Sequence, residues 1–97
     1  GAEKIFNYTN RFSGLGALPG LRKTVEVIEK RTRYIRAMNL IMATPQQSLL
    51  ATHYNENRGY FQMHRTSTDQ LEIVCSQPYP LPNAEWQTIE NRTVAEL

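Results

Sequence analysis

One thiol and two imidazoles are the side chains of this sequence best suited to catalysis. Cys75 is the only cysteine, and His53 and His64 are the only histidines. A histidine beside a cysteine promotes the thiolate, so Cys75 with either histidine as its base is one hypothesis. The alternation of Leu71, Ile73 and Cys75 favours another, in which Cys75 is a small buried residue on a strand. The second role is the commoner one for such a cysteine.

The other polar residues form no recognisable site. No Cys/His cluster has the spacing of zinc ligands, and Asp69 and Glu72 flank a predicted turn where solvation accounts for them. Ser13-Gly14-Leu15-Gly16 lacks the Walker and dinucleotide-binding patterns, so its glycines indicate a connection. We therefore assign no catalytic, cofactor-binding or metal-binding residue.

Composition describes one ordinary globular domain. The 97 residues are 40% hydrophobic and 21% charged. The net charge of +2 is too small to indicate a nucleic-acid partner, and Glu26 and Glu29 interrupt the basic residues between Arg22 and Arg36. A lone cysteine fits a reducing compartment, and no apolar run approaches the roughly 20 residues that span a bilayer. We expect a soluble, cytoplasmic protein without a membrane partner.

Hydrophobic periodicity predicts helices in the first third of the chain. Glu3 to Arg11 is compatible with a short amphipathic helix or the tail of a longer one, and Pro19 to Arg36 forms the main helix. Glu26 with Lys30, and Glu29 with Arg33, are spaced as exposed helical ion pairs. The apolar stripe of the main helix consists of Leu21, Val25, Ile28, Thr32 and Ile35.

Strands are predicted for the rest of the chain. Apolar runs at 40–43 and 49–51, joined by Pro45 to Ser48, indicate an antiparallel hairpin. Residues 60–65 and 71–76 alternate and extend it into a meander, and Trp86 to Ile89 and Thr93 to Leu97 are two further short strands. The predicted fold class is α+β, with an antiparallel sheet covered by one long helix in a single domain, 1–97.

Several of these segments resemble one known family in the same order. Residues 38–44 (Met-Asn-Leu-Ile-Met-Ala-Thr) and 48–54 (Ser-Leu-Leu-Ala-Thr-His-Tyr) resemble the "L-N-L-A-x-T-D-G" and "L-x-A-T-R-Y" hairpin of class II glutamine amidotransferase-like proteins. Residues 73–78 resemble its "V-A-S-E-P-L" strand, and 86–91 its closing "W-x-x-I/V-P-x" segment. Residues 3–6 resemble the end of its "S-T-D-S-E-x-x-F" helix.

The sequence departs from the family pattern at three places. Thr44-Pro45-Gln46 replaces the Thr-Asp-Gly turn, His53 replaces arginine, and Gln77 replaces glutamate. The strand pattern is intact.

The resemblance implies an αββα sandwich of the N-terminal-nucleophile type. Its members hydrolyse the side-chain amide of glutamine with an N-terminal cysteine whose own α-amine acts as base. The match runs from about Pro19 to the end and covers the C-terminal portion of that domain, whereas the catalytic cysteine belongs to the other half. We expect a scaffold portion that is inactive in isolation and meets L-glutamine only in the assembled domain. The alternative is a small non-enzymatic α+β module that binds a ligand or a protein.

An incomplete sandwich predicts association, because contiguous apolar surface is rarely left open to water. We expect either a homodimer through an open sheet face or edge, or binding of a complementing N-terminal half. The residues expected to supply the contact are Leu40, Met42, Leu49, Phe61 and Met63.

Overall fold

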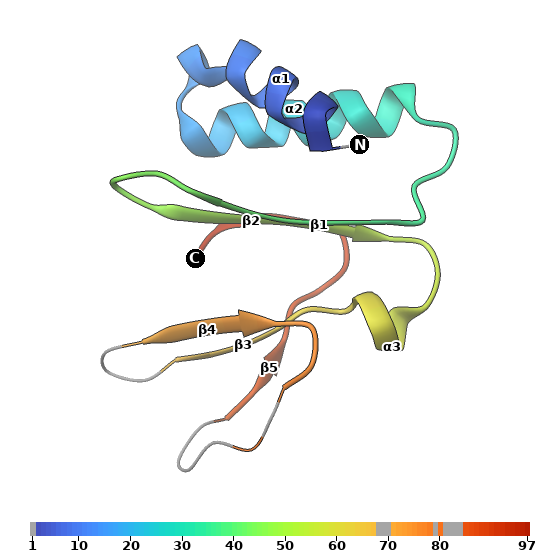
Figure 1. Ribbon diagram of the computed structural model, residues 1–97, viewed down its shortest axis with the longest axis vertical. Coiled ribbons are helices and arrows are strands. Elements are labelled where there is room, and N and C mark those ends of the chain that lie inside the picture. The colour runs from blue at the N-terminus through green and yellow to red at the C-terminus, as the bar shows by residue number, and fades with distance from the viewer. Residues whose placement is uncertain (1, 68–70, 79, 81–84) are drawn as a thin grey trace.

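Two helices precede the first strand of the chain (Figure 1). The computed structural model describes residues 2–67, 71–78, 80 and 85–97. In chain order the elements are α1 (Ala2–Arg11), the 3₁₀ turn η1 (Ser13–Leu15), α2 (Ala17–Arg31), β1 (Ala37–Ala43), β2 (Ser48–Tyr54), α3 (Arg58–Phe61), β3 (His64–Ser67), β4 (Glu72–Cys75), β5 (Gln87–Thr88) and β6 (Thr93–Glu96).

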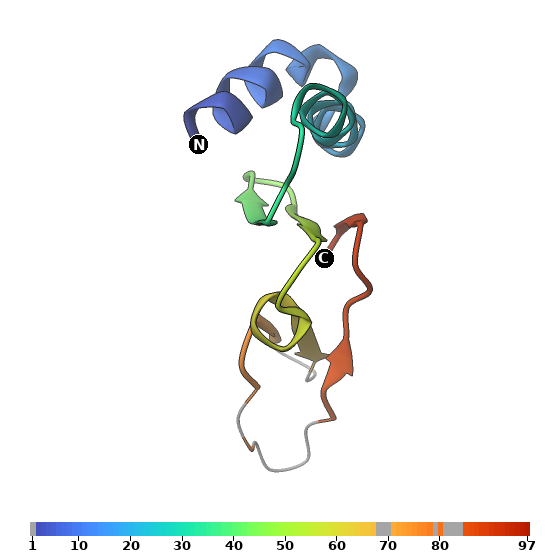
Figure 2. The same cartoon turned by 90° about the vertical axis from the view of Figure 1, so that its right-hand side faces the viewer.

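The elements stack as three layers (Figures 1 and 2). Helices α1 and α2 form the first layer. The second layer, called the first sheet below, has the strand order β1-β2-β6, and the third layer, the second sheet, has the order β4-β3-β5. Every described strand pair is antiparallel. The α+β class predicted from the sequence is confirmed, with two sheets in place of one.

Two helices, not one long helix, lie on the first sheet. Gly16, with φ of +97°, provides the turn between them. At Gly20 a Cβ atom would lie 2.8 Å from the carbonyl oxygen of Phe12, so glycine is what allows α2 to approach the end of α1 this closely. Because Thr32 is already extended, with φ −104° and ψ 125°, α2 ends at Arg31 and the prediction of helix to Arg36 was wrong.

The hairpin predicted from the two apolar runs is confirmed. Strands β1 and β2 pair without interruption from Ala37 opposite Tyr54 to Ala43 opposite Ser48. The side chain of Thr44 closes the turn, because its Oγ1 accepts the backbone N–H groups of Gln46 and Gln47 at 3.3 and 3.1 Å.

The predicted meander was wrong, because the chain leaves the first sheet after β2. Residues 58–61 form α3, which takes up the first two residues of the strand expected at 60–65. It follows Asn57, which has a left-handed conformation with φ of 51°. Strand β3 therefore pairs with β4 and β5, away from β2. The chain returns to the first sheet only with β6, which lies beside β2.

The face predicted for strand β4 was also wrong. Leu71, expected inside, is 62% exposed, and it is Val74 that packs on the buried cluster of Leu50, Met63 and Ile89. Residues 71–76 carry apolar side chains at both odd-numbered and even-numbered positions. Alternation alone therefore could not decide which set faces the core.

None of the helices within the described residues has the length and apolar character required to cross a bilayer.

Replacement of Leu50 by alanine should lower the free energy of unfolding by about 2–5 kcal/mol, because it leaves a cavity between the two sheets. Leu50 is 1% exposed, whereas Leu15 is 58% exposed. The same change at Leu15 should cost less than about 1 kcal/mol. Urea denaturation monitored by circular dichroism measures both. Equal unfolding midpoints for the two variants would contradict the packing of one sheet on the other.

Candidate functional site

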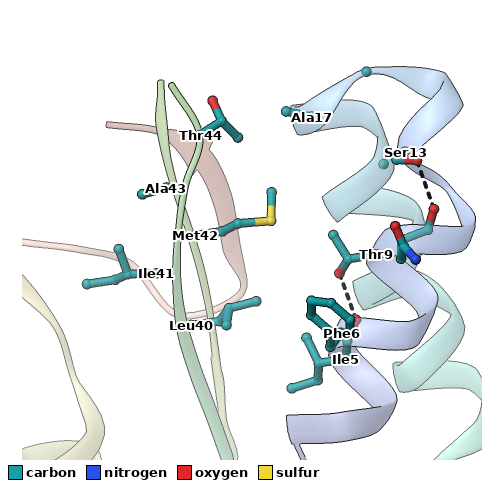
Figure 3. Close-up of a pocket in the computed structure, with 13 residues that line it drawn as sticks. Ile5, Phe6, Thr9, Ser13, Ala17, Leu40, Ile41, Met42, Ala43 and Thr44 are labelled. Atoms are coloured by element: carbon teal, nitrogen blue, oxygen red, sulfur yellow. Dashed lines mark hydrogen bonds between the residues drawn. The ribbon is translucent and has the colours of Figure 1, made fainter. Parts of the chain in front are cut away.

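An apolar groove with a volume of about 600 Å³ lies between α1 and β1 (Figure 3). This volume lies within the range of about 300–1,000 Å³ that is usual for ligand sites. Its lining residues are Ile5, Phe6, Thr9, Asn10, Ser13, Gly16, Ala17, Gly20, Leu40, Ile41, Met42, Ala43 and Thr44.

The polar side chains on the α1 wall of the groove bond mostly to their own helix. The hydroxyl of Thr9 donates to the carbonyl of Ile5 at 2.7 Å, and that of Ser13 donates to Asn10 at 2.8 Å (Figure 3). Opposite them, Leu40 and Met42 point from β1 toward α1 (Figure 3). The groove can therefore accept apolar groups, and no residue that lines it is suited to acid–base chemistry.

His53, on β2, is the one buried histidine among the described residues, and its imidazole faces α2. The residue is 5% exposed. Its Nδ1 atom is 2.6 Å from Oε2 of Glu29, and its Nε2 atom is 3.2 Å from the side-chain nitrogen of Asn55. Because the amide nitrogen of Asn55 can only donate, Nε2 of His53 accepts, and Nδ1 carries the hydrogen that is donated to Glu29.

Both ring nitrogens of His53 are thus engaged, which leaves none to serve as a base or a metal ligand. The imidazole links α2 to β2 beneath a polar depression of about 480 Å³. Beside it, Tyr34 donates its hydroxyl to Glu56 at 2.8 Å. This hydrogen bond raises the pKa of Tyr34 above its ordinary value, because it favours the protonated phenol.

Cys75 lies directly across from His64 on neighbouring strands of the second sheet. Both side chains are half-buried, on the face that Ile73 also occupies, so the expectation of a buried Cys75 was wrong. His53 belongs to the first sheet and takes no part in this pair.

The acidic candidates form no site. Glu72 forms an ion pair with Arg65, and Asp69 lies outside the described residues. Within the described ranges, no three His, Cys, Asp or Glu side chains lie close enough together to hold a metal ion.

Two of the residues expected to supply an interface are buried within the chain. Leu49 is fully buried under the helices, and Met63 is buried between the sheets. Both faces of β2 are therefore covered, whereas β1 keeps exposed side chains. Among them is Ile41, which lies beside the groove, as does the exposed Phe6 of α1.

Sequence reasoning missed both the groove and the partner of His53. Helical spacing predicts an ion pair of Glu29 with Arg33, but α2 ends before Arg33, and the Glu29 carboxylate bonds to His53 instead. The pair of Glu26 with Lys30 does form, at 3.0 Å. Its hydrogen bond lowers the pKa of Glu26, and the charge of Lys23 adds to the effect.

Comparisons with protein-family models, with curated proteins and with solved structures gave no match to this chain.

Replacing Glu29 by alanine should cost about 1–3 kcal/mol of stability, because it leaves the buried Nδ1–H of His53 without an acceptor. Glu26→Ala is the matched control on the exposed face of the same helix, where ion pairs contribute little. Glu29→Gln retains an acceptor oxygen and should fall between the two. Urea midpoints measure all three variants, and equal losses for Glu29→Ala and Glu26→Ala would mean that the His53 contact is not a structural link.

Proposed function

We propose that this chain is the C-terminal scaffold portion of a class II glutamine amidotransferase-like domain, with the catalytic cysteine supplied by a complementing N-terminal half. The observation that carries the proposal is the layer order of helices, first sheet and second sheet. The same order would supply three of the four layers of an αββα sandwich. They are built from the segments in which the sequence resembles that family.

The buried contact between the two sheets supports this proposal. Leu50 from the first sheet, Met63 before β3 and Ile89 after β5 form one cluster. In such a sandwich the two sheets pack face to face around an apolar core. None of the described helices covers the far face of the second sheet (Figures 1 and 2). Ile73 and Cys75 lie on this face, because Val74 between them packs toward the first sheet. A fourth layer would cover that face.

His53 also fits a scaffold role. It stands where the family motif has arginine, and it still presents an N–H to the Glu29 carboxylate at 2.6 Å. A donor on β2 therefore holds the helix layer on the sheet. On this proposal Glu29 and His53 act by positioning the layers, and neither contacts glutamine.

The apolar groove favours a second candidate function, a non-enzymatic module that binds an apolar ligand. That function needs no complementing half and no glutamine. The two candidates differ in what activity appears when the rest of the proposed domain is present.

Ammonia release from L-glutamine distinguishes the two candidates. The isolated chain should release none. The chain assembled with a cysteine-initiated N-terminal half encoded at the same locus should hydrolyse glutamine, because the terminal cysteine supplies the nucleophile. Coupling the ammonia to glutamate dehydrogenase measures the rate.

Two variants serve as controls for this assay. Alanine in place of the terminal cysteine of the complementing half should abolish turnover, and Cys75→Ala should leave it unchanged. Turnover by the isolated chain that disappears with Cys75→Ala would overturn the proposal and make Cys75 the nucleophile. An assembled protein without turnover would favour the ligand-binding module.

A further inference from the structure

The outer edge of β1 is an unprotected strand edge. Within the described residues no strand pairs with it, because β1 ends the strand order β1-β2-β6. The strand is seven residues long, is paired with β2 without a bulge, and contains neither charge nor proline. Proteins usually protect such edges with charges, prolines or bulges, because an open edge can pair with another strand.

The backbone groups that face this edge can be identified from the pairing. The N–H of Asn55 donates to the carbonyl of Arg36 at 3.1 Å, and the N–H of Thr44 donates to Gln47 at 2.7 Å. In an antiparallel pair the direction of these groups alternates along the strand. The even-numbered residues of β1 therefore bond to β2. The odd-numbered residues point their N–H and C=O groups outward, and these are Ala37, Asn39, Ile41 and Ala43.

The apolar groove lies at this same edge. Leu40 and Met42 point toward α1, whereas Ile41 and Ala43 point away from it, yet all four line the groove (Figure 3). Residues of opposite faces can border one groove only where the edge of the strand opens into it. Helix α1 reaches beyond β1 on the side away from β2 (Figure 2) and so overhangs the position of an additional strand.

We propose that the groove receives one extended, uncharged strand, which pairs with the outer edge of β1 beneath α1. The proposal rests on the proposed function, since the complementing half of the domain is the source of that strand. Alternate side chains of the strand pack on Ile5, Phe6 and Met42, and its backbone bonds to Ile41 and Ala43. The residues that line the groove include no Asp, Glu, Lys or Arg, so a charged segment would lose solvation without gaining a partner.

Two other occupants fit less well. An apolar small molecule would remove the outward N–H and C=O groups of Ile41 and Ala43 from water without replacing their hydrogen bonds. A second copy that paired its own β1 antiparallel to this one would place both overhanging α1 helices on the same side of the joined sheet. The two helices would then compete for the space over the junction (Figure 2).

Amide hydrogen exchange of the chain with a synthetic strand tests the proposal. The probe is a nine-residue peptide in which Thr and Val alternate between two terminal Lys residues, and the control peptide has proline at the central position. The probe should slow exchange at Ile41 and Ala43 by about tenfold or more, as new hydrogen bonds protect them. Exchange at Leu40 and Met42, which already bond to β2, should change far less. The control peptide should have no effect.

A pair of variants at Ile41 tests whether the probe binds through the backbone of the β1 edge. Among the hydrogen-bonding groups of β1, Ile41→Pro removes a single N–H, which points outward, and it should abolish the protection by the probe. Ile41→Ala also removes the isoleucine side chain but keeps that N–H, and it should retain the protection. Phe6 is 71% exposed, so Phe6→Glu should preserve the fold while placing a charge in the groove. It should weaken probe binding about tenfold or more, which keeps the test decisive if Ile41→Pro fails to fold.

Three results would contradict the proposal that a strand pairs with β1 in the groove. The first is unchanged exchange at Ile41 and Ala43 with saturating probe. The second is protection that appears only as the chain self-associates in sedimentation, which would assign the edge to a second copy. The third is an assembled protein that hydrolyses glutamine while both amides still exchange rapidly, which would leave the proposed function standing. Protection by the probe together with an assembled protein that lacks turnover would instead refute the proposed function and support the strand site.

Discussion

Burial of β2 on both faces is the constraint on which the rest of this structure depends. Leu49 and Ala51 face the helices, and Leu50 faces the second sheet. Every residue from Leu49 to Tyr54 is buried. Each side chain of a strand that is covered on both sides must either be apolar or have its polar atoms hydrogen-bonded. His53 meets this requirement through its bond to Glu29. The backbone of Tyr54 bonds to the side-chain amide of Asn91 at 2.8 and 2.7 Å for the same reason.

The sequence predicted those elements whose signals are local. The β1–β2 hairpin, the part of the apolar stripe from Leu21 to Ile28 and the glycine connection before α2 follow from spacing and turn chemistry. The last two residues of the predicted stripe, Thr32 and Ile35, lie beyond the end of α2. The second sheet was not predicted, because residues 60–65 alternate like a strand whereas the structure begins β3 only at His64. Tertiary packing decides which strands pair with β3. The alternation of apolar and polar residues along a strand carries no information about its pairing partner.

The candidate sites were harder to predict than the fold for the same physical reason. His53 and Glu29 are 24 residues apart, and nothing in either local pattern indicates that they meet. The groove depends on where α1 lies over β1, which the amphipathicity of α1 leaves open. Cys75 and His64 were candidates by residue type. The structure places them side by side on a half-buried face, and the buried imidazole proves to be His53.

On the proposed function, the open edge of β1 and the far face of the second sheet are both explained by an incomplete sandwich. An experimental structure of this chain assembled with the proposed complementing half tests this explanation. We expect a strand paired with β1 under α1 and a helix layer on the face of Ile73 and Cys75. An assembly in which both surfaces face solvent, with the chain folded as a separate unit, would contradict the incomplete sandwich.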